Sequence, residues 1–175
     1  MSRTITAAVR KEAILSPCGR YRYLLTREWP PRLTPMTFIM LNPSTADAEN
    51  DDPTIRRCMS FATRLEVSGI RVVNLFAWRA TDKRELTRHE YEVSVGPGND
   101  DHIRAAVRGP GIVVVAWGSH AGELGKRVAA REIQVRAICG QEQKPIFCLG
   151  VAKNGRPRHP LYLPANAQLK VWAGL

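Results

Sequence analysis

Three polar residues stand at or just after apolar runs of the chain, and their types suit chemistry on a heterocyclic ring. Pro43 keeps Asn42 out of the helical backbone region, so its amide could orient a water molecule or a sugar. Asn74 offers one acceptor and two donors, which match the amide-imide edge of a pyrimidine. His159, in a basic loop, could donate to a developing anion. The structural alternatives are an Asx-turn for Asn42, a polar network for Asn74 and an exposed loop histidine for His159.

An acidic cluster lies close behind the first of these residues, at Asp47, Asp51 and Asp52. Asp47 is the candidate general base. Asp52 has a structural explanation, because it precedes Pro53 and would cap a helix there. No metal-ligand spacing, phosphate-binding glycine loop or serine-hydrolase elbow occurs. We therefore expect no metal and no cofactor, and we disfavour kinase-like, dinucleotide-binding and serine-hydrolase activities.

The elements that must position these residues are short apolar strands alternating with helices. Continuous apolar runs indicate strands that are buried on both faces, at residues 37–41, 70–75, 112–117 and 146–150. Helix signals fall between them, at residues 53–67, 101–108 and about 119–130. Residues 13–15 and 21–25 flank a turn and predict an N-terminal β-hairpin. The pattern predicts an α/β three-layer sandwich with a central, mostly parallel four-stranded sheet, in a single domain over residues 1–175.

Two helix ends carry specific expectations. The first helix should stop at Ser68 and Gly69, with the glycine as the left-handed cap. The second helix should be capped by Asn99 or Asp100.

Ligands of open parallel sheets bind outside the carboxyl ends of the strands. Each predicted strand here is followed at that end by polar or glycine-containing sequence: Asn42, Asn74, Trp117-Gly118 and the loop that leads to His159. We therefore expect Asn42, Asn74 and His159 to converge on one pocket.

The charge balance points to a polyanionic partner. The chain has 26 Lys and Arg residues against 16 Asp and Glu, a net charge of +10, and 20 of the basic residues are arginine. The arginine fork fits phosphate in a bidentate way, so nucleic acid, DNA in the first place, is the expected partner. The alternative is a solvated basic surface. Candidate contacts to the nucleic-acid backbone are Arg79, Lys153, Arg156, Arg158, Ser119 and His120.

Cysteine usage favours a reducing compartment. Cys18, Cys58, Cys139 and Cys148 form no C-x-x-C pair and no zinc-like spacing. The N-terminus lacks an apolar signal segment, and no apolar run is long enough to span a bilayer. We expect a cytoplasmic monomer without a membrane partner.

Over roughly residues 13–163 the chain is identified as a member of the family called domain of unknown function 1643. The match rests on five motifs: Leu41-Asn42-Pro43-Ser44-Thr45-Ala46-Asp47, Asp51-Asp52-Pro53-Thr54-Ile55-Arg56-Arg57-Cys58, Asn74-Leu75-Phe76-Ala77-Trp78-Arg79-Ala80-Thr81, Gly96-Pro97-Gly98-Asn99-Asp100 and His159-Pro160-Leu161-Tyr162.

A more distant resemblance is to uracil-DNA glycosylases. Asn42-Pro43 is similar to their water-positioning loop, and Asn74 resembles their base-reading asparagine at a strand end. Residues 116–121 resemble their Trp-Gly strand end, and His159-Pro160 resembles the start of the loop that donates to the base oxygen. The usual serine after His-Pro is replaced by residues 161–162.

This resemblance implies cleavage of the N-glycosidic bond of a flipped, modified pyrimidine in DNA. Asn42, Asp47 and His159 would be catalytic. The base would lie against Asn74, Phe76, Trp78, Tyr162, Pro43 and Ser44. One alternative is a non-catalytic module that binds nucleic acid or a nucleobase, and another is a transferase or lyase that acts on a free nucleoside.

Overall fold

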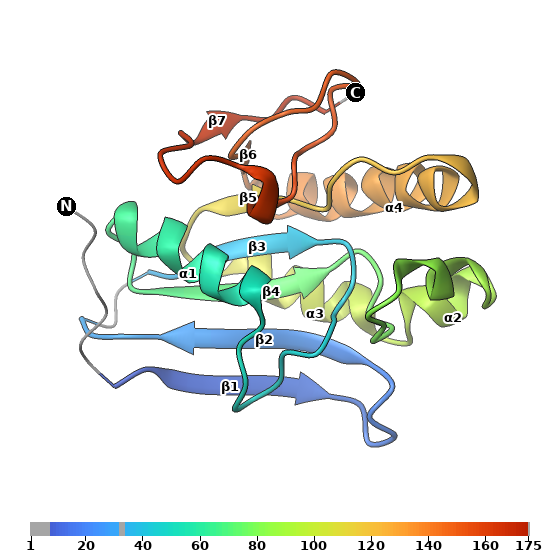
Figure 1. The fold of residues 1–175 in the computed structure, drawn as a ribbon, viewed down its shortest axis with the longest axis horizontal. Helices are drawn as coiled ribbons and strands as arrows, with labels where there is room; N and C mark the ends of the chain where they lie inside the picture. The colour runs from blue at the N-terminus through green and yellow to red at the C-terminus, as the bar shows by residue number, and fades with distance from the viewer. Residues whose placement is uncertain (1–7, 32–33, 175) are drawn as a thin grey trace.

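The computed structural model describes residues 8–31 and 34–174, which form an α/β fold around one mixed sheet. The sheet has seven strands in the order β1-β2-β4-β3-β5-β6-β7 (Figure 1). The strands are β1 (Arg10–Leu15), β2 (Arg22–Glu28), β3 (Met36–Met40), β4 (Gly69–Asn74), β5 (Val113–Val115), β6 (Ile146–Cys148) and β7 (Lys170–Val171).

The centre of the sheet is parallel and its edges are antiparallel. β3 pairs in parallel with β4 on one side and β5 on the other, and β5 pairs in parallel with β6. The hairpin β1-β2 adds to β4 in the antiparallel sense, and β7 adds to β6. The expected four-stranded sheet was therefore too small, because the hairpin and the C-terminal strand extend the sheet at both edges.

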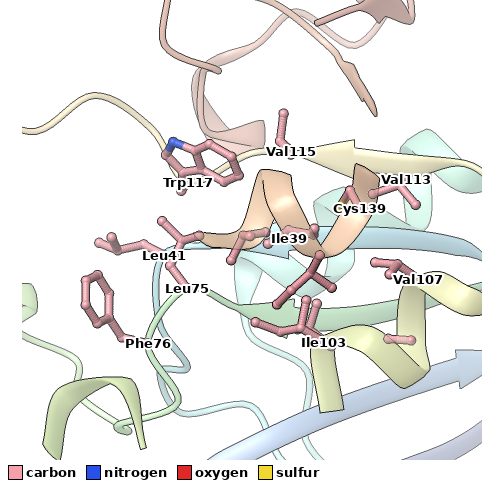
Figure 2. Packing of buried hydrophobic residues seen from close by; sticks show 14 of the residues in the cluster. Ile39, Leu41, Leu75, Phe76, Ile103, Val107, Val113, Val115, Trp117 and Cys139 are labelled. Carbon is pink, nitrogen blue, oxygen red and sulfur yellow. The ribbon is translucent and has the colours of Figure 1, made fainter. Parts of the chain in front are cut away.

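Helices cover both faces of this sheet. Side chains of α1 (Pro53–Arg64) pack with Phe38 and Val72 on one face. Side chains of α3 (Asn99–Arg108) and α4 (Gly122–Gln141) pack with Ile39 and Val73 on the other (Figure 2). Neighbouring residues of β3 and β4 thus belong to opposite cores, which explains their unbroken apolar sequence. The remaining short helices are α2 (Tyr91–Val95), η1 (Lys83–Thr87) and η2 (Pro160–Tyr162).

Helix α1 begins as its sequence predicts and ends differently. The Asp52 side chain accepts a hydrogen bond from the Ile55 backbone N–H, and Pro53 is the first helical residue. The residue with positive φ after the helix is Glu66, at 59°, so the expected left-handed cap at Gly69 was wrong. Gly69 instead begins β4, where an added Cβ would lie 2.7 Å from the Arg27 carbonyl oxygen. The close approach of β2 accounts for the glycine.

Helix α3 starts two residues earlier than expected. Its N-cap is Gly98, with φ of 72°, and Asn99 is already inside the helix rather than capping it. The Asn99 Nδ2 atom donates to the carbonyl oxygens of Asn74 and Leu75, at 3.1 and 3.2 Å. This side chain therefore fastens α3 to the carboxyl end of β4.

Helix α4 runs to Gln141, well past the expected end near residue 130. Arg131 continues the helix although it is almost fully buried, because its guanidinium donates to Asp100 at 2.6 Å and to the Leu75 carbonyl oxygen at 2.8 Å. A buried charge with these partners is tolerated inside a helix, and a sequence pattern does not show them. None of the helices in the described residues is long and apolar enough to cross a membrane.

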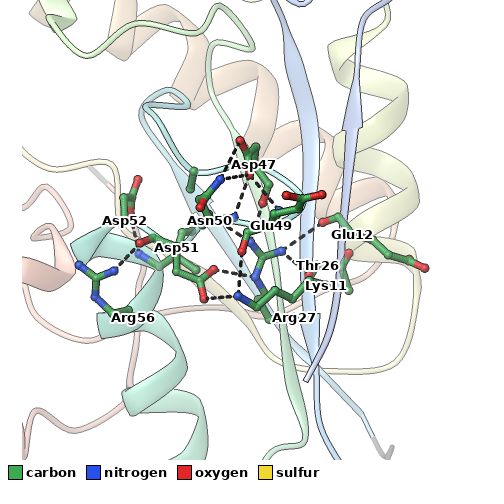
Figure 3. A network of polar contacts seen from close by, with 12 residues as sticks. Lys11, Glu12, Thr26, Arg27, Asp47, Glu49, Asn50, Asp51, Asp52 and Arg56 are labelled. Atoms are coloured by element: carbon green, nitrogen blue, oxygen red, sulfur yellow. Dashed lines mark hydrogen bonds and ion pairs between the residues drawn. The ribbon is translucent and has the colours of Figure 1, made fainter. Parts of the chain in front are cut away.

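The loop between β3 and α1 is held by a fully buried arginine (Figure 3). Arg27 of β2 donates from Nε to Asp51 Oδ1 at 2.7 Å and from Nη2 to the Asp47 carbonyl oxygen at 2.6 Å. Its Nη1 atom donates to the Thr26 carbonyl oxygen at 2.8 Å. One side chain thus ties the end of this loop to the sheet, just before α1 begins.

Replacing Arg27 with methionine should lower the free energy of unfolding by about 3 kcal/mol, because the Asp51 carboxylate and the loop carbonyls lose their partner. Urea denaturation measures the change. Arg10→Met is the matched control: its ion pair with Glu12 is exposed, so its loss should cost no more than about 1 kcal/mol. Equal losses for the two variants would contradict the role given to Arg27.

Candidate functional site

A pocket of about 680 Å³ opens at the carboxyl ends of the parallel strands. It lies where β3 has β4 on one side and β5 on the other, the point at which open sheets bind ligands. Its size is within the usual range for small-molecule sites. The lining residues are Arg22, Met40, Leu41, Asn42, Ser44, Asp52, Thr54, Ile55, Val72, Asn74, Ala80, Thr81, Asp82, Lys83, Trp117, Gly118, Ser119, His120, Ala152, Arg158, His159 and Tyr162.

The structure brings together about half of the residues that the sequence singled out. Those on the pocket wall are Asn42, Ser44, Asn74, Ser119, His120, Arg158, His159 and Tyr162. Those that do not line it are Pro43, Asp47, Phe76, Trp78, Arg79, Lys153 and Arg156. The expected convergence of Asn42, Asn74 and His159 is therefore present in the structure, whereas the roles given to them remain predictions.

Asn74 is the last residue of β4 and is only 2% exposed. Its side-chain Oδ1 atom is buried without a hydrogen-bond partner among the described residues. An unsatisfied buried acceptor typically costs about 1–3 kcal/mol. Because this side chain lines the pocket, a ligand that donates a hydrogen bond here would remove that cost.

Asn42 has its amide orientation set by the backbone. Its Nδ2 atom donates to the carbonyl oxygens of Pro43, at 2.9 Å, and Ala80, at 2.8 Å. Both amide hydrogens are thereby used, and Oδ1 is left as an acceptor. Asn42 can therefore accept a hydrogen bond from a water molecule or from a sugar hydroxyl.

His159 presents one ring nitrogen to the backbone and keeps the other free for a ligand. Its Nδ1 atom accepts from the Leu161 backbone N–H at 3.3 Å, so the proton of the neutral ring sits on Nε2. Burial lowers the pKa of His159; the Asp52 carboxylate opposes this, while His120 and Lys83 reinforce it. The neutral ring is thus favoured, with an N–H donor available in the pocket wall.

His120 is arranged in the opposite way. Its Nε2 atom donates to the Trp117 carbonyl oxygen at 2.8 Å, and its Nδ1 atom is buried without a partner among the described residues. Burial is the main cause that lowers the pKa of His120. Gly118, with φ of 83°, lies between the two rings: an added Cβ would be 3.5 Å from His120 Nε2 and 3.7 Å from His159 Cβ. Both distances are ordinary van der Waals contacts, so the positive φ, rather than a lack of space, accounts for the glycine.

Asp47, the expected general base, does not reach the pocket. Its carboxylate accepts from the backbone N–H groups of Glu49 and Asn50, at 2.9 and 2.8 Å, and these bonds lower the pKa of Asp47. Asp47 therefore orders its own loop, a role that short acidic side chains commonly have. The nearby carboxylate on the pocket wall is that of Asp52, which also caps α1.

Two of the three expected aromatic platforms pack elsewhere: Phe76 lies in the core, and the half-buried Trp78 lies at its edge. Phe76 is fully buried and packs edge-to-face on Tyr91, with ring centroids 6.2 Å apart. Trp78 packs against His89, with ring centroids 4.3 Å apart. Tyr162 does line the pocket: it is 72% exposed, and its ring centroid is 5.7 Å from that of His159. Tyr162 is therefore the aromatic residue available for stacking on a ligand.

Most of the expected phosphate contacts are engaged elsewhere. Arg79 donates to the Gly19 carbonyl oxygen at 3.1 Å, and Arg156 pairs with Glu132 at 3.3 Å. Lys153 is exposed, away from the pocket wall. Arg158 stays at the pocket, where its Nη2 atom donates to the Tyr162 carbonyl oxygen at 2.8 Å. Ser119 Oγ also lines it and accepts from Asn154 at 2.6 Å.

Sequence reasoning missed several residues of the pocket wall, most notably Arg22. This arginine is only 3% exposed, and its Nη1 atom donates to the Ala46 carbonyl oxygen at 2.7 Å. The available signal was a charge inside the otherwise apolar segment 21–25. The other missed polar residues are Asp52, Thr54, Thr81, Asp82 and Lys83.

The remaining chemistry-bearing groups are also accounted for. Cys18, Cys58, Cys139 and Cys148 are all free, and all but Cys18 are buried. Within residues 8–31 and 34–174, no group of three or more His, Cys, Asp or Glu residues is placed to hold a metal ion.

Comparison with known proteins identifies the family of the chain. The family model described as a protein of unknown function, DUF1643, matches residues 22–161, and the chain belongs to that family. No curated protein and no solved structure matches it. The matched segment contains every residue of the pocket wall, from Arg22 to His159, except Tyr162.

The two pocket imidazoles should titrate below 6.5 in NMR spectra recorded across a pH series, since burial disfavours their charged forms. The unfolded chain then binds protons that the folded chain does not, so the free energy of unfolding should fall as pH drops through about 6.5. His120→Gln with His159→Gln should flatten that fall. His102→Gln, outside the pocket, serves as the control. Titration of both rings at or above 6.5 would contradict the buried, neutral assignment.

Proposed function

We propose that this DUF1643 protein binds a pyrimidine base flipped out of DNA and hydrolyses its N-glycosidic bond. The observation that carries the proposal is one pocket that holds both the unpaired Oδ1 atom of Asn74 and the Nε2–H donor of His159. The sequence resemblance to uracil-DNA glycosylases supports it, because Asn42, Asn74 and His159 resemble functional positions of that superfamily, and all three line this pocket.

The reaction requires charge stabilisation rather than a strong nucleophile. The sugar gains oxocarbenium character and the bonding pair leaves with the base, which becomes anionic. Asn74 Oδ1 would accept a ring N–H of the base, and His159 would donate from Nε2–H to the base oxygen that gains charge. Asn42 Oδ1 would orient the water that adds its hydroxyl to the anomeric carbon. The proton that the water loses ends on the departing base.

The histidine suits this role because it is neutral. Burial lowers the pKa of His159, so at neutral pH its ring carries a single donor hydrogen directed away from the Leu161 N–H. A preorganised donor in a water-poor site stabilises a developing anion without a proton transfer being required.

The rim of the pocket supports access by a strand of nucleic acid. Arg158 and Lys83 place positive charge on the lining, and Tyr162 offers an exposed ring beside His159. Tyr162 would stack on or beside the flipped nucleotide. The volume of about 680 Å³ leaves room for a base with substituents, which favours a modified pyrimidine as the substrate.

A second function, binding of the base without cleavage, is favoured by one observation. Asp47 lies outside the pocket, and Asn42 offers a water molecule only an acceptor. The pocket therefore contains the groups that would recognise a base, whereas it lacks the expected group that would deprotonate a water molecule. A non-catalytic nucleobase-binding module would use Asn74 and His159 in the same way.

Oligonucleotides that carry uracil or modified pyrimidines should release free base in the presence of the protein, detected by mass spectrometry. His159→Ala should lower the release rate by about 10²–10³-fold while binding persists, because a donor to the leaving anion is lost. Asn74→Asp should alter base preference, because an amide donor becomes an acceptor. Asn166→Asp, an exposed change of the same type, should have no effect. Binding without release from every substrate would select the binding module.

Association with DNA should weaken steeply with salt, since phosphate contacts release counterions. Anisotropy titrations across a salt series give the slope. Arg158→Gln should reduce that slope by about 1, the share of one phosphate contact. Arg10→Gln removes the same charge from β1, away from the pocket, and should leave the slope nearer the wild-type value. No binding at low salt would refute the nucleic-acid partner.

A further inference from the structure

Three arginines are buried in the described part of the chain, and they differ in their partners. Arg27 pairs with Asp51 at 2.7 Å, and Arg131 pairs with Asp100 at 2.6 Å. Arg22 forms no ion pair with any described residue: its Nη1 atom donates to a carbonyl oxygen, and its Nε–H is buried without a partner. A buried charge without a direct ion-pair partner is destabilising, so this exception points to a ligand.

The position of Arg22 tells where that ligand would lie. Arg22 starts β2, and its backbone N–H donates to the Ala77 carbonyl oxygen at 3.0 Å, just beyond the end of β4. Its side chain lines the same pocket as Asn74. An ion-pair partner for Arg22 would therefore lie inside the pocket that we assign to the base.

Arg22 remains a cation despite its burial. Burial is the largest influence on its pKa and lowers it to about 10, while the charge of Asp52 acts in the opposite direction. At neutral pH the guanidinium is protonated and presents donors in a fixed planar fork. Such a fork fits the oxygens of phosphate.

The surroundings of Arg22 contribute further donors. The N-terminal turn of α1 lies on the pocket wall with Thr54, and Lys83 lines the wall as well. Helix α1 has 12 residues, and its N-terminus favours negative charge. The carboxylates on this wall already have partners. Asp52 accepts a hydrogen bond from the Ile55 N–H at 2.8 Å, and Asp82 forms an ion pair with Arg84 at 2.8 Å.

We propose that the pocket contains an anion subsite at Arg22 that binds a phosphate group, so the ligand is a nucleotide rather than a free base or a nucleoside. The anion subsite itself does not depend on the proposed glycosylase activity; only the base portion of the ligand rests on that function. Its phosphate could be the phosphodiester beside a flipped nucleotide in DNA or the terminal group of a free mononucleotide.

The subsite is tested by thermal denaturation with inorganic phosphate, 2′-deoxyuridine 5′-monophosphate, deoxyuridine and a uracil-containing oligonucleotide, at constant ionic strength. A ligand that binds the folded state raises Tm with its concentration. Phosphate and the phosphorylated ligands should raise the wild-type Tm more than deoxyuridine does. Arg22→Met should abolish the increment from phosphate, and Arg22→Lys should keep part of it. Arg10→Gln, which removes an exposed charge on β1 outside the pocket, should keep all of it.

The increment in Tm, rather than the Tm of the ligand-free protein, distinguishes a binding role of Arg22 from a structural one. A purely structural Arg22 would change the Tm of the ligand-free protein and leave the phosphate increment in place, which would overturn the subsite. No increment with phosphate, mononucleotide or oligonucleotide in the wild type would overturn it too.

If Arg22→Met does not fold, loss of at least half the increment in Arg22→Lys supports the subsite, and full retention overturns it. Mononucleotide binding through Arg22 without base release from DNA would support the subsite and refute the glycosylase. An increment from the oligonucleotide alone would assign the phosphate to DNA.

Discussion

A guanidinium that is removed from water must have its charge and its donors satisfied, and in this protein that requirement at Arg27 shapes one wall of the pocket. Its partners in the loop that follows β3 are Asp51 and the carbonyl oxygens of residues 47 and 50. Satisfying them pulls this loop onto β2. As a result α1 begins at the pocket, with Asp52 as its cap, and the Ala46 carbonyl oxygen lies against Arg22.

The opposite wall follows from the order of the parallel strands. Because β3 lies between β4 and β5, the chain segments that leave these strands turn away from one another and open a space between them. Asn74 ends one strand, and the turn at Gly118 after the other folds His120 back toward that space. The loop that carries His159 forms a further side of the pocket. Residues far apart in sequence thus meet because the carboxyl ends of the parallel strands share one edge of the sheet.

Several buried polar atoms of the pocket residues lack a hydrogen-bond partner in the described part of the protein. Asn74 Oδ1, His120 Nδ1 and Arg22 Nε are each buried without a partner among the described residues, whereas Arg27 and Arg131 are fully engaged away from the pocket wall. Such groups lower the stability of the free protein, and clusters of them are expected where a ligand supplies the missing contacts. Two acceptors beside a cation suit a ligand that combines a hydrogen-bonding ring with a negative charge.

Local sequence patterns determined the four parallel strands, the Asp52 cap and the meeting of Asn42, Asn74 and His159, because apolar runs and strand ends are properties of neighbouring residues. Burial on both faces did not extend to β6, where Ile146 and Phe147 are half-buried. The same patterns extended the site wrongly to Asp47, Phe76 and Trp78. Only the tertiary structure decided that these side chains serve a loop turn and the aromatic packing of the interior. It also decided that Arg22 faces the pocket without an ion-pair partner among the described residues. The direction of a side chain depends on contacts with elements distant in sequence, and no local periodicity encodes them.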